Sequence, residues 1–185
     1  MNRFRKVRSH CDIFIGEYPF HQELKEEWAP ILESYPDCQD RLTNVKATMT
    51  EWDMLSVMDE YNFDTSKLKK LKETMLQDSY RFYESCKYRS SHTSKIGYRN
   101  FWSNIYRKGD YTKSHNHIFS NVSCVYFLKA KWYHSPLVFT QYGERIRPKE
   151  GNYVLFPSYL MHHVPKHKFN DTRITISGNI EDNDL

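Results

Sequence analysis

Apolar residues recur at helical spacing through much of the first half of the chain. In residues 21–35, "HQELKEEWAPILESY", hydrophobic side chains three or four positions apart would share one face of a helix, which Pro30 should kink or shorten. Residues 66–86 repeat this pattern more cleanly, with lysines opposite a stripe formed by Leu68, Leu71, Met75, Ser79, Phe82 and Cys86. The pattern therefore predicts two amphipathic helices before residue 95.

Beyond residue 95 the pattern changes to short apolar runs separated by turn-forming residues. The runs are "FWSNIY", "HNHI", "VSCVYFL", "PLVF", "NYVLF" and "TRITISGNI", and the turns include "RKGD", "HSP" and "PKEGN". Such spacing without intervening helices predicts a mainly β fold of jelly-roll type, a double-stranded β-helix, with the N-terminal helices bracing its outside. Because neither half reads as a complete core, we expect a single domain over 1–185, with a helical bracing region at 1–95 and a jelly-roll core at 96–185.

Composition narrows the class of protein further. Of the 185 residues, 39% are hydrophobic and 16% aromatic, which is enough to fill a core, and the net charge of +4 is too small to indicate nucleic acid as a partner. The one tight basic cluster, "RFRKVR" at residues 3–8, is interpreted as a solvated tail. Four scattered cysteines, the lack of a signal peptide and the lack of a long apolar run favour a cytoplasmic protein without a membrane partner.

Two histidines, His115 and His117, stand one residue apart at the start of a predicted strand. On a strand they would project to the same face, roughly 6.6 Å apart, and imidazole binds iron, zinc, copper and nickel. A third ligand must come from elsewhere, and His162 and His163 follow an apolar run and a turn. The other histidines have no spacing partner and are expected on the surface or in loops: His10, His21, His92, His134 and His167.

The segment "TRITIS" alternates strictly, so that Arg173, Thr175 and Ser177 share one face. If that face lines the interior of a barrel, Arg173 is a buried cation that needs an anionic partner. No carboxylate is placed to serve it on this strand, whereas the carboxylate of a bound ligand would.

The order of these elements resembles the iron(II)- and 2-oxoglutarate-dependent oxygenases. More narrowly, it is similar to an oxygenase family common in marine phages and bacteria, whose motifs appear here between about residues 100 and 180. They read "WSNIY", "RKGD", "HNH", "VYFL", "PKEG", "LFPSYLMHHV" and "RITIS". The resemblance implies Fe(II), 2-oxoglutarate and O2 as cofactor and cosubstrates, with oxidative decarboxylation of 2-oxoglutarate coupled to hydroxylation of a substrate.

The resemblance also implies a role for each matching residue. It places the metal ligands at His115, His117 and His162, with His163 pointing elsewhere, and the 2-oxoglutarate carboxylate at Arg173. Residues expected around the cosubstrate or in the pocket lining are Thr175, Tyr106, Asn104 and Tyr126. The wider superfamily has a carboxylate where this chain has His117, and Asp110, a conceivable substitute, lies at an offset that would point it away.

Two alternatives stay open at this stage. One is a three-histidine, cupin-type metal dioxygenase or isomerase that does not use 2-oxoglutarate, for which Arg173 would have no evident purpose. The other is a jelly-roll binding module without catalysis. The substrate, a small molecule or a protein side chain, is not indicated by the sequence, and a homodimer through the helices is left open. If the protein is viral, its compartment would be the host cytoplasm.

Overall fold

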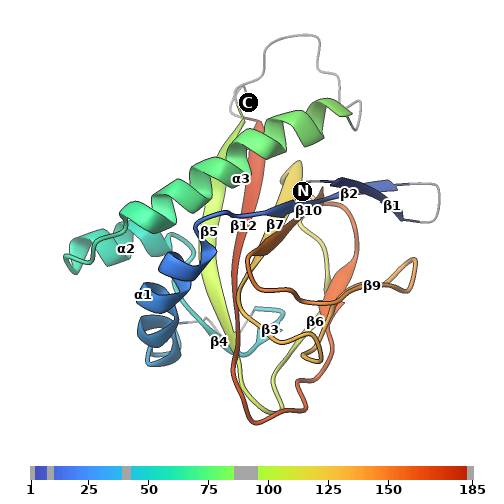
Figure 1. The fold of residues 1–185 in the computed structure, drawn as a ribbon. Coiled ribbons are helices and arrows are strands. Elements are labelled where there is room, and N and C mark those ends of the chain that lie inside the picture. Colours follow the sequence, from blue (N-terminus) through green and yellow to red (C-terminus); the bar gives the residue numbers. More distant parts are fainter. Residues whose placement is uncertain (1–2, 8–10, 39–42, 86–95, 183–185) are drawn as a thin grey trace.

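The structure, a computed structural model, describes residues 3–7, 11–38, 43–85 and 96–182 and consists of two antiparallel sheets flanked by helices (Figure 1). The larger sheet has the order β1 (Arg3–Val7), β2 (Cys11–Glu17), β10 (Asn152–Pro157), β7 (Val122–Lys129), β12 (Arg173–Asp182), β5 (Ile96–Tyr106) and β4 (Thr48–Met49). The smaller sheet has the order β3 (Val45–Lys46), β6 (Tyr111–His115), β11 (His162–Val164), β8 (Leu137–Phe139) and β9 (Glu144–Ile146).

From β5 onward the chain winds back and forth between the two sheets. β5, β7, β10 and β12 lie in the larger sheet, whereas β6, β8, β9 and β11 lie in the smaller one, and every neighbouring pair is antiparallel. This alternation is the double-stranded β-helix, or jelly roll, so the predicted fold class is confirmed.

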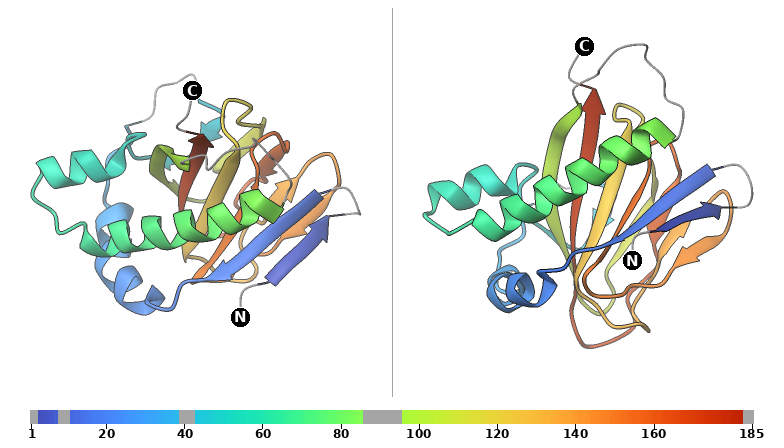
Figure 2. Two further views of the ribbon diagram at one scale, coloured as in Figure 1. Left: turned by 90° about the horizontal axis from the view of Figure 1, so that it is seen from above. Right: turned by 45° about the horizontal axis from the view of Figure 1, so that its top comes forward.

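Three helices cover the outer face of the larger sheet: α1 (His21–Glu33), α2 (Met54–Glu60) and α3 (Ser66–Ser85) (Figures 1 and 2). The two predicted helices are confirmed, and α1 continues through Pro30 to Glu33. The buried residues of α3 match the predicted stripe from Leu68 to Phe82, while Cys86 lies outside the described residues. No helix in the described part of the chain has both the length and the apolar character needed to cross a membrane.

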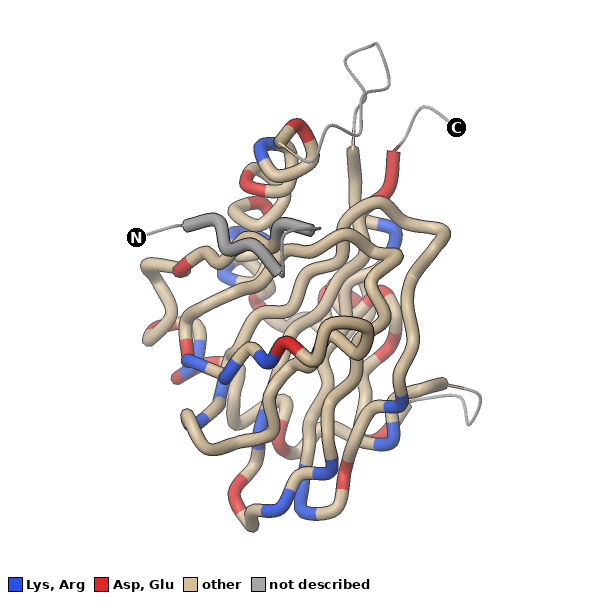
Figure 3. The backbone as a smooth tube through the Cα atoms, turned by 90° about the vertical axis from the view of Figure 1, so that its right-hand side faces the viewer, with Lys and Arg blue, Asp and Glu red and all other residues tan. Residues whose placement is uncertain are grey.

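The N-terminal region contributes strands as well as helices, which its sequence pattern did not indicate. β2 pairs with β10 and thereby extends the larger sheet, and β1 occupies the basic segment that was interpreted as a solvated tail. β3 and β4 each have two residues, too few to show an alternation. Lysines, arginines and acidic residues lie mostly on the helices and in the connections, and few lie within the central strands (Figure 3).

Alternation along β12 separates an apolar face from a polar one. Ile174, Ile176 and Ile180 belong to the core cluster shared with the helices. Arg173, Thr175 and Ser177, which the alternation of "TRITIS" placed on one face, line a cavity between the two sheets together with Asn179. A second apolar cluster beside this cavity, which includes Phe127, Phe139 and Phe156, joins the two sheets. The fold therefore holds a polar row of side chains inside an apolar sandwich.

Candidate metal centre

Three histidines meet at one end of the cavity between the sheets. His115 is the last residue of β6 and pairs directly with His162, the first residue of β11, with their ring centroids 4.4 Å apart. His117 lies 4.8 Å from His115 and 5.3 Å from His162 by the same measure. One ring nitrogen from each lies within 4.8 Å of the other two, so the three imidazoles face a common point.

Backbone carbonyls fix the orientation of two of these rings. His115 Nδ1 lies 2.8 Å from the carbonyl oxygen of Lys113, and His162 Nδ1 lies 2.8 Å from that of Leu160. Because a carbonyl oxygen only accepts hydrogen bonds, both Nδ1 atoms must carry the proton. Each Nε2 is thereby left with a free lone pair, the state in which a neutral imidazole binds a metal ion.

Burial keeps all three histidines neutral. The pKa of His115 is lowered by desolvation, and that of His162 is lowered well below its usual value by desolvation and by its two neighbours. The pKa of His117 falls to about 3 because of desolvation and the neighbouring His115. Protons therefore compete weakly with a metal ion for these nitrogens near neutral pH.

His117 reaches the cluster from a loop, which corrects the prediction that "HNHI" forms a strand. β6 ends at His115, and the His117 N–H donates to the carbonyl of Ser158 at 2.8 Å. Its ring also lies edge-on to Trp102, with centroids 6.3 Å apart. His163 points away from the cluster, where its Nδ1 lies 3.0 Å from the Thr140 hydroxyl.

Arg173 lies in the same cavity and is almost wholly buried, with 1% of its surface exposed. Its guanidinium carbon lies 4.7 Å from the centre of the Tyr106 ring and 5.5 Å from that of Phe127. Nε and Nη1 have no hydrogen-bond partner among the described residues, and none of the described residues that line the cavity is Asp or Glu. Burial lowers the pKa of Arg173, but a guanidinium remains charged at neutral pH.

Three of the expected pocket residues line this cavity. Tyr106 and Asn104 lie on β5 directly opposite Arg173 and Thr175 on β12. The Tyr106 hydroxyl is 2.8 Å from that of Thr112, and Trp102 Nε1 donates to Asn104 Oδ1 at 3.1 Å. Trp102 also lines the cavity, although it was not expected there; its place in the alternation of Asn104 and Tyr106 along β5 is the signal that would have identified it.

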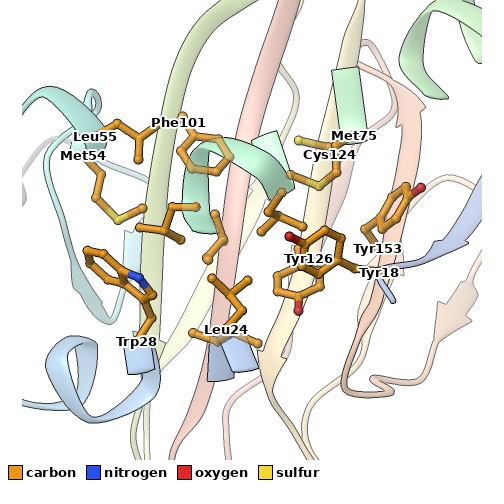
Figure 4. Packing of buried hydrophobic residues seen from close by; sticks show 14 of the residues in the cluster. Tyr18, Leu24, Trp28, Met54, Leu55, Met75, Phe101, Cys124, Tyr126 and Tyr153 are labelled. Carbon is orange, nitrogen blue, oxygen red and sulfur yellow. The ribbon is translucent and has the colours of Figure 1, made fainter. Parts of the chain in front are cut away.

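Tyr126 does not line the cavity, which corrects its expected place there. Even-numbered residues of β7 face the helices, so Tyr126 packs in the core beside Tyr18 (Figure 4). Its hydroxyl lies 2.6 Å from His21 Nδ1. Asp110 is also no substitute ligand, because its carboxylate accepts the N–H of Arg107 within the turn before β6.

His134 and His167 lie in loops, as expected, but both are buried and lie close to Asp171. His134 Nδ1 accepts the N–H of Lys131 at 3.2 Å, and its Nε2 lies 3.1 Å from Asp171 Oδ2. That carboxylate oxygen also contacts the Lys131 ammonium at 2.8 Å. Because His134 Nδ1 already accepts a backbone N–H and the Lys131 ammonium already neutralises Asp171, we interpret this cluster as a structural network. His21 is partly buried against Tyr126, and His10 and His92 lie outside the described residues.

A comparison with protein families now bears on these residues. Residues 139–179 match the family described as "Putative 2OG-Fe(II) oxygenase", and this segment contains His162 and Arg173 but neither His115 nor His117. Over these residues the chain resembles the 2OG-Fe(II) oxygenases in sequence. The resemblance noted in the sequence is thereby confirmed, and Fe(II) and 2-oxoglutarate are the groups that the family's description names.

Solved structures support the fold of this oxygenase type. The chain resembles a prolyl-4-hydroxylase from Pseudomonas putida, with 17% identity, a TM-score of 0.56 and 95% of each chain covered. It also resembles HygX from Streptomyces hygroscopicus, solved with nickel and 2-oxoglutarate bound, with 9% identity, a TM-score of 0.60 and coverages of 94% and 84%.

A third similar structure is SnoN, an alpha-ketoglutarate-dependent epimerase of nogalamycin biosynthesis, with 8% identity, a TM-score of 0.64 and coverages of 91% and 77%. No curated protein matches the chain. At these identities, the likeness to the solved structures establishes the fold alone.

Proposed function

We propose that this chain is an iron(II)- and 2-oxoglutarate-dependent dioxygenase, and that it hydroxylates its substrate. In this proposal His115, His117 and His162 hold the iron, and Arg173 binds the distal carboxylate of 2-oxoglutarate. One observation carries the proposal: a buried guanidinium with two unpartnered nitrogens shares a cavity with three converging, neutral imidazoles. An unpaired buried cation is costly, so its presence calls for an anionic ligand.

The donor set fits the proposed groups. Imidazole nitrogens with free lone pairs suit iron(II), and a planar guanidinium suits a carboxylate through paired N–H donors. Because all three metal ligands are neutral, the ion would keep its full double positive charge. The dianion 2-oxoglutarate would offset that charge. It would therefore neutralise more of the metal's charge here than in a site where a carboxylate ligand already neutralises one unit.

The residues of the chain would bind, orient and shield the reactants. Arg173 holds the distal carboxylate, and the rings of Tyr106 and Phe127 fix the plane of its guanidinium. Thr175 adds a hydroxyl beside it. Trp102 and Phe156 border the cavity and exclude water from its apolar side. The bound iron, 2-oxoglutarate and dioxygen together supply the oxidising chemistry, which yields succinate, carbon dioxide and an oxidised substrate.

The same proposal covers the whole chain as a single oxygenase domain, 1–185. Its N-terminal helices and strands brace the jelly roll that carries the site. The protein would act in the cytoplasm. The substrate is a small molecule or a side chain of a protein, and the outer groove described below bears on this choice.

A second candidate is favoured by the histidine at position 117. Three histidines without a carboxylate also suit a cupin-type metal enzyme that does not use 2-oxoglutarate. The two candidates differ in the role of Arg173. The 2-oxoglutarate-dependent enzyme needs it to bind the distal carboxylate of the cosubstrate, whereas the cupin-type enzyme does not.

Oxygen-dependent formation of succinate tests the proposal. The protein is purified without oxygen, supplied with iron(II) and 2-oxoglutarate, and exposed to air, after which succinate is quantified. We expect succinate from the wild type and none above background from Arg173→Ala or His162→Ala. Metal binding without any consumption of 2-oxoglutarate would favour the second candidate, and the absence of specific metal binding would reject both in favour of a binding module.

A further inference from the structure

An open groove adjoins the metal centre on the side of His117. It has a volume of about 490 Å3 and shares His117 and Asn179 with the inner cavity, in which only about 40 Å3 is free. Its walls include Trp52, Asn100, Asn116, Ile118 and Phe119. A wide outer groove thus meets a narrow inner space at the proposed iron ligand.

We propose that this groove binds an uncharged, partly apolar polypeptide segment and presents one of its side chains to the centre. This inference rests on the proposed function and names the class of its substrate. The narrow inner space is the one assigned to the metal ion and 2-oxoglutarate, so most of the substrate must lie in the open groove.

Exposed apolar side chains indicate that the occupant of the groove is large. Phe119 is 79% exposed and Ile118 is 63% exposed, although they directly follow His117 in the chain. Trp52 is 44% exposed and packs edge-on against Trp102 of the inner cavity, with centroids 4.8 Å apart. Apolar side chains gathered around a groove mark a contact surface for a macromolecule, whereas pockets for small molecules enclose most of the ligand.

The charges around the groove favour an uncharged segment of polypeptide. Among the described residues that line it, Arg99 is the one with a permanent charge, and Glu181 pairs with it at 2.9 Å. No free lysine or arginine is therefore available there for the phosphates of a nucleic acid. No carboxylate in that lining would attract a cationic substrate, and the metal ion and Arg173 would repel one.

Side-chain amides supply the polar contacts that a peptide backbone needs. Asn179 donates to Asn100 Oδ1 at 3.0 Å and accepts from the Ser123 hydroxyl at 2.8 Å. This chain of hydrogen bonds leaves the Asn100 NH2 group available to a peptide carbonyl. Asn116 Nδ2 lies 3.5 Å from the Tyr159 carbonyl, which leaves its own oxygen available to a peptide N–H.

Selection from a random library of 12-residue peptides tests the inference. The library is displayed on phage and applied to the full chain loaded with nickel(II) and 2-oxoglutarate, and enriched peptides are synthesised with a fluorescent label. We expect enrichment of uncharged sequences with apolar residues. Their affinity, measured by fluorescence anisotropy, should fall about tenfold or more in Phe119→Ser and in Ile118→Ser. Trp132→Ser is the matched control, because Trp132 is 69% exposed and lies outside the groove, and it should leave the affinity unchanged.

Three outcomes would overturn the inference: no enrichment, enrichment of cationic peptides, or binding that Phe119→Ser does not weaken. A labelled single-stranded 12-mer of DNA and sedimentation of the free protein test the other occupants. Binding of the DNA or formation of a dimer that depends on Phe119 would also overturn it. The absorption of the iron–2-oxoglutarate chelate is recorded for every variant. If the chelate forms but no peptide binds, this inference alone fails, whereas failure of the chelate in the wild type removes the proposed function.

Discussion

Arg173 lies directly opposite Tyr106 in the β12–β5 ladder, and its guanidinium carbon is 4.7 Å from the centre of the tyrosine ring. Tyr106 therefore orients a buried cation that has no carboxylate partner among the described cavity residues. A cation over an aromatic ring is stabilised by roughly 1–2 kcal/mol when both are desolvated. The tyrosine thus orients the guanidinium for binding an anion, and the unpaired buried charge destabilises the ligand-free protein.

Replacing Arg173 with methionine should stabilise the apo protein while removing its affinity for 2-oxoglutarate. Methionine fills much of the same space without an unpaired charge, and such replacements of buried ionic groups are often neutral or stabilising by about 1–4 kcal/mol. Urea unfolding of the metal-free proteins measures the first effect, and calorimetric titration with 2-oxoglutarate measures the second. A clear loss of stability in Arg173→Met would show that Arg173 has a structural partner.

Tyr106→Leu and Tyr126→Phe should change different properties, because Tyr106 lines the cavity and Tyr126 lies in the core beneath the helices. Loss of the Tyr106 ring should raise the concentration of 2-oxoglutarate needed for half-maximal succinate formation about tenfold, because the guanidinium loses its support. Loss of the Tyr126 hydroxyl removes its hydrogen bond to His21 and should lower the free energy of unfolding by about 1 kcal/mol. Since Tyr126 faces the helices, its replacement should not alter the dependence on 2-oxoglutarate. The opposite pattern would mean that the two faces of the larger sheet have been assigned wrongly.

Substitutions at the three histidines should have unequal effects. His162→Ala should abolish iron binding, because it removes a proposed ligand that is buried and whose tautomer is fixed by the Leu160 carbonyl. His117→Asp should bind iron(II) at least as tightly as the wild type, since a carboxylate reduces the positive charge of the centre by one unit, whereas His117→Ala should bind it more weakly. Anaerobic titration with iron(II) gives the order of affinities. Equal affinity in His117→Ala and the wild type would show that His117 is not a ligand.

The metal-free protein should lose stability as the pH falls below about 6.5. The folded-state pKa values of His115, His117 and His162 are lowered, so the unfolded chain takes up protons first. For each such histidine, this stability is complete above the unfolded-state pKa and falls by about 1.4 kcal/mol per pH unit between that pKa and the lower folded-state pKa. Urea unfolding at several pH values gives the free energy of unfolding as a function of pH. Its slope should be smaller in His117→Ala than in the wild type, by the contribution of one histidine. An identical slope in the two proteins would contradict this explanation.

Much of the site could be predicted from the sequence because its residues fall on regular strands. The alternation of "TRITIS" placed Arg173 and Thr175 on one face, and β12 confirms it. His162 follows an apolar run that could be recognised as a strand, and His115 precedes one. What joins them is the β6–β11 pairing, a long-range contact that only the assembled jelly roll provides.

The errors arose where local pattern does not determine the environment. Both faces of β7 carry large apolar side chains and both are buried, so the sequence of this strand gives no clear sign of which residue faces the pocket. His117 lies beyond the end of its strand, where alternation no longer applies. His134 had no spacing partner in the sequence because Asp171 reaches it through the tertiary fold, whereas His167 Nε2 contacts the carbonyl oxygen of Asp171 only four residues along the chain.

Anaerobic titration of the iron(II)-loaded protein with 2-oxoglutarate tests the central claim most directly, because the chelate has its own weak visible absorption. The claim is that Arg173 and the three histidines form one site. Wild type should develop the absorption with saturation at one 2-oxoglutarate per chain, and His162→Ala should not develop it. Arg173→Met should still bind iron(II) but need at least about a hundredfold more 2-oxoglutarate, as expected for loss of a buried charge pair. The same titration curve in Arg173→Met and the wild type would contradict the claim.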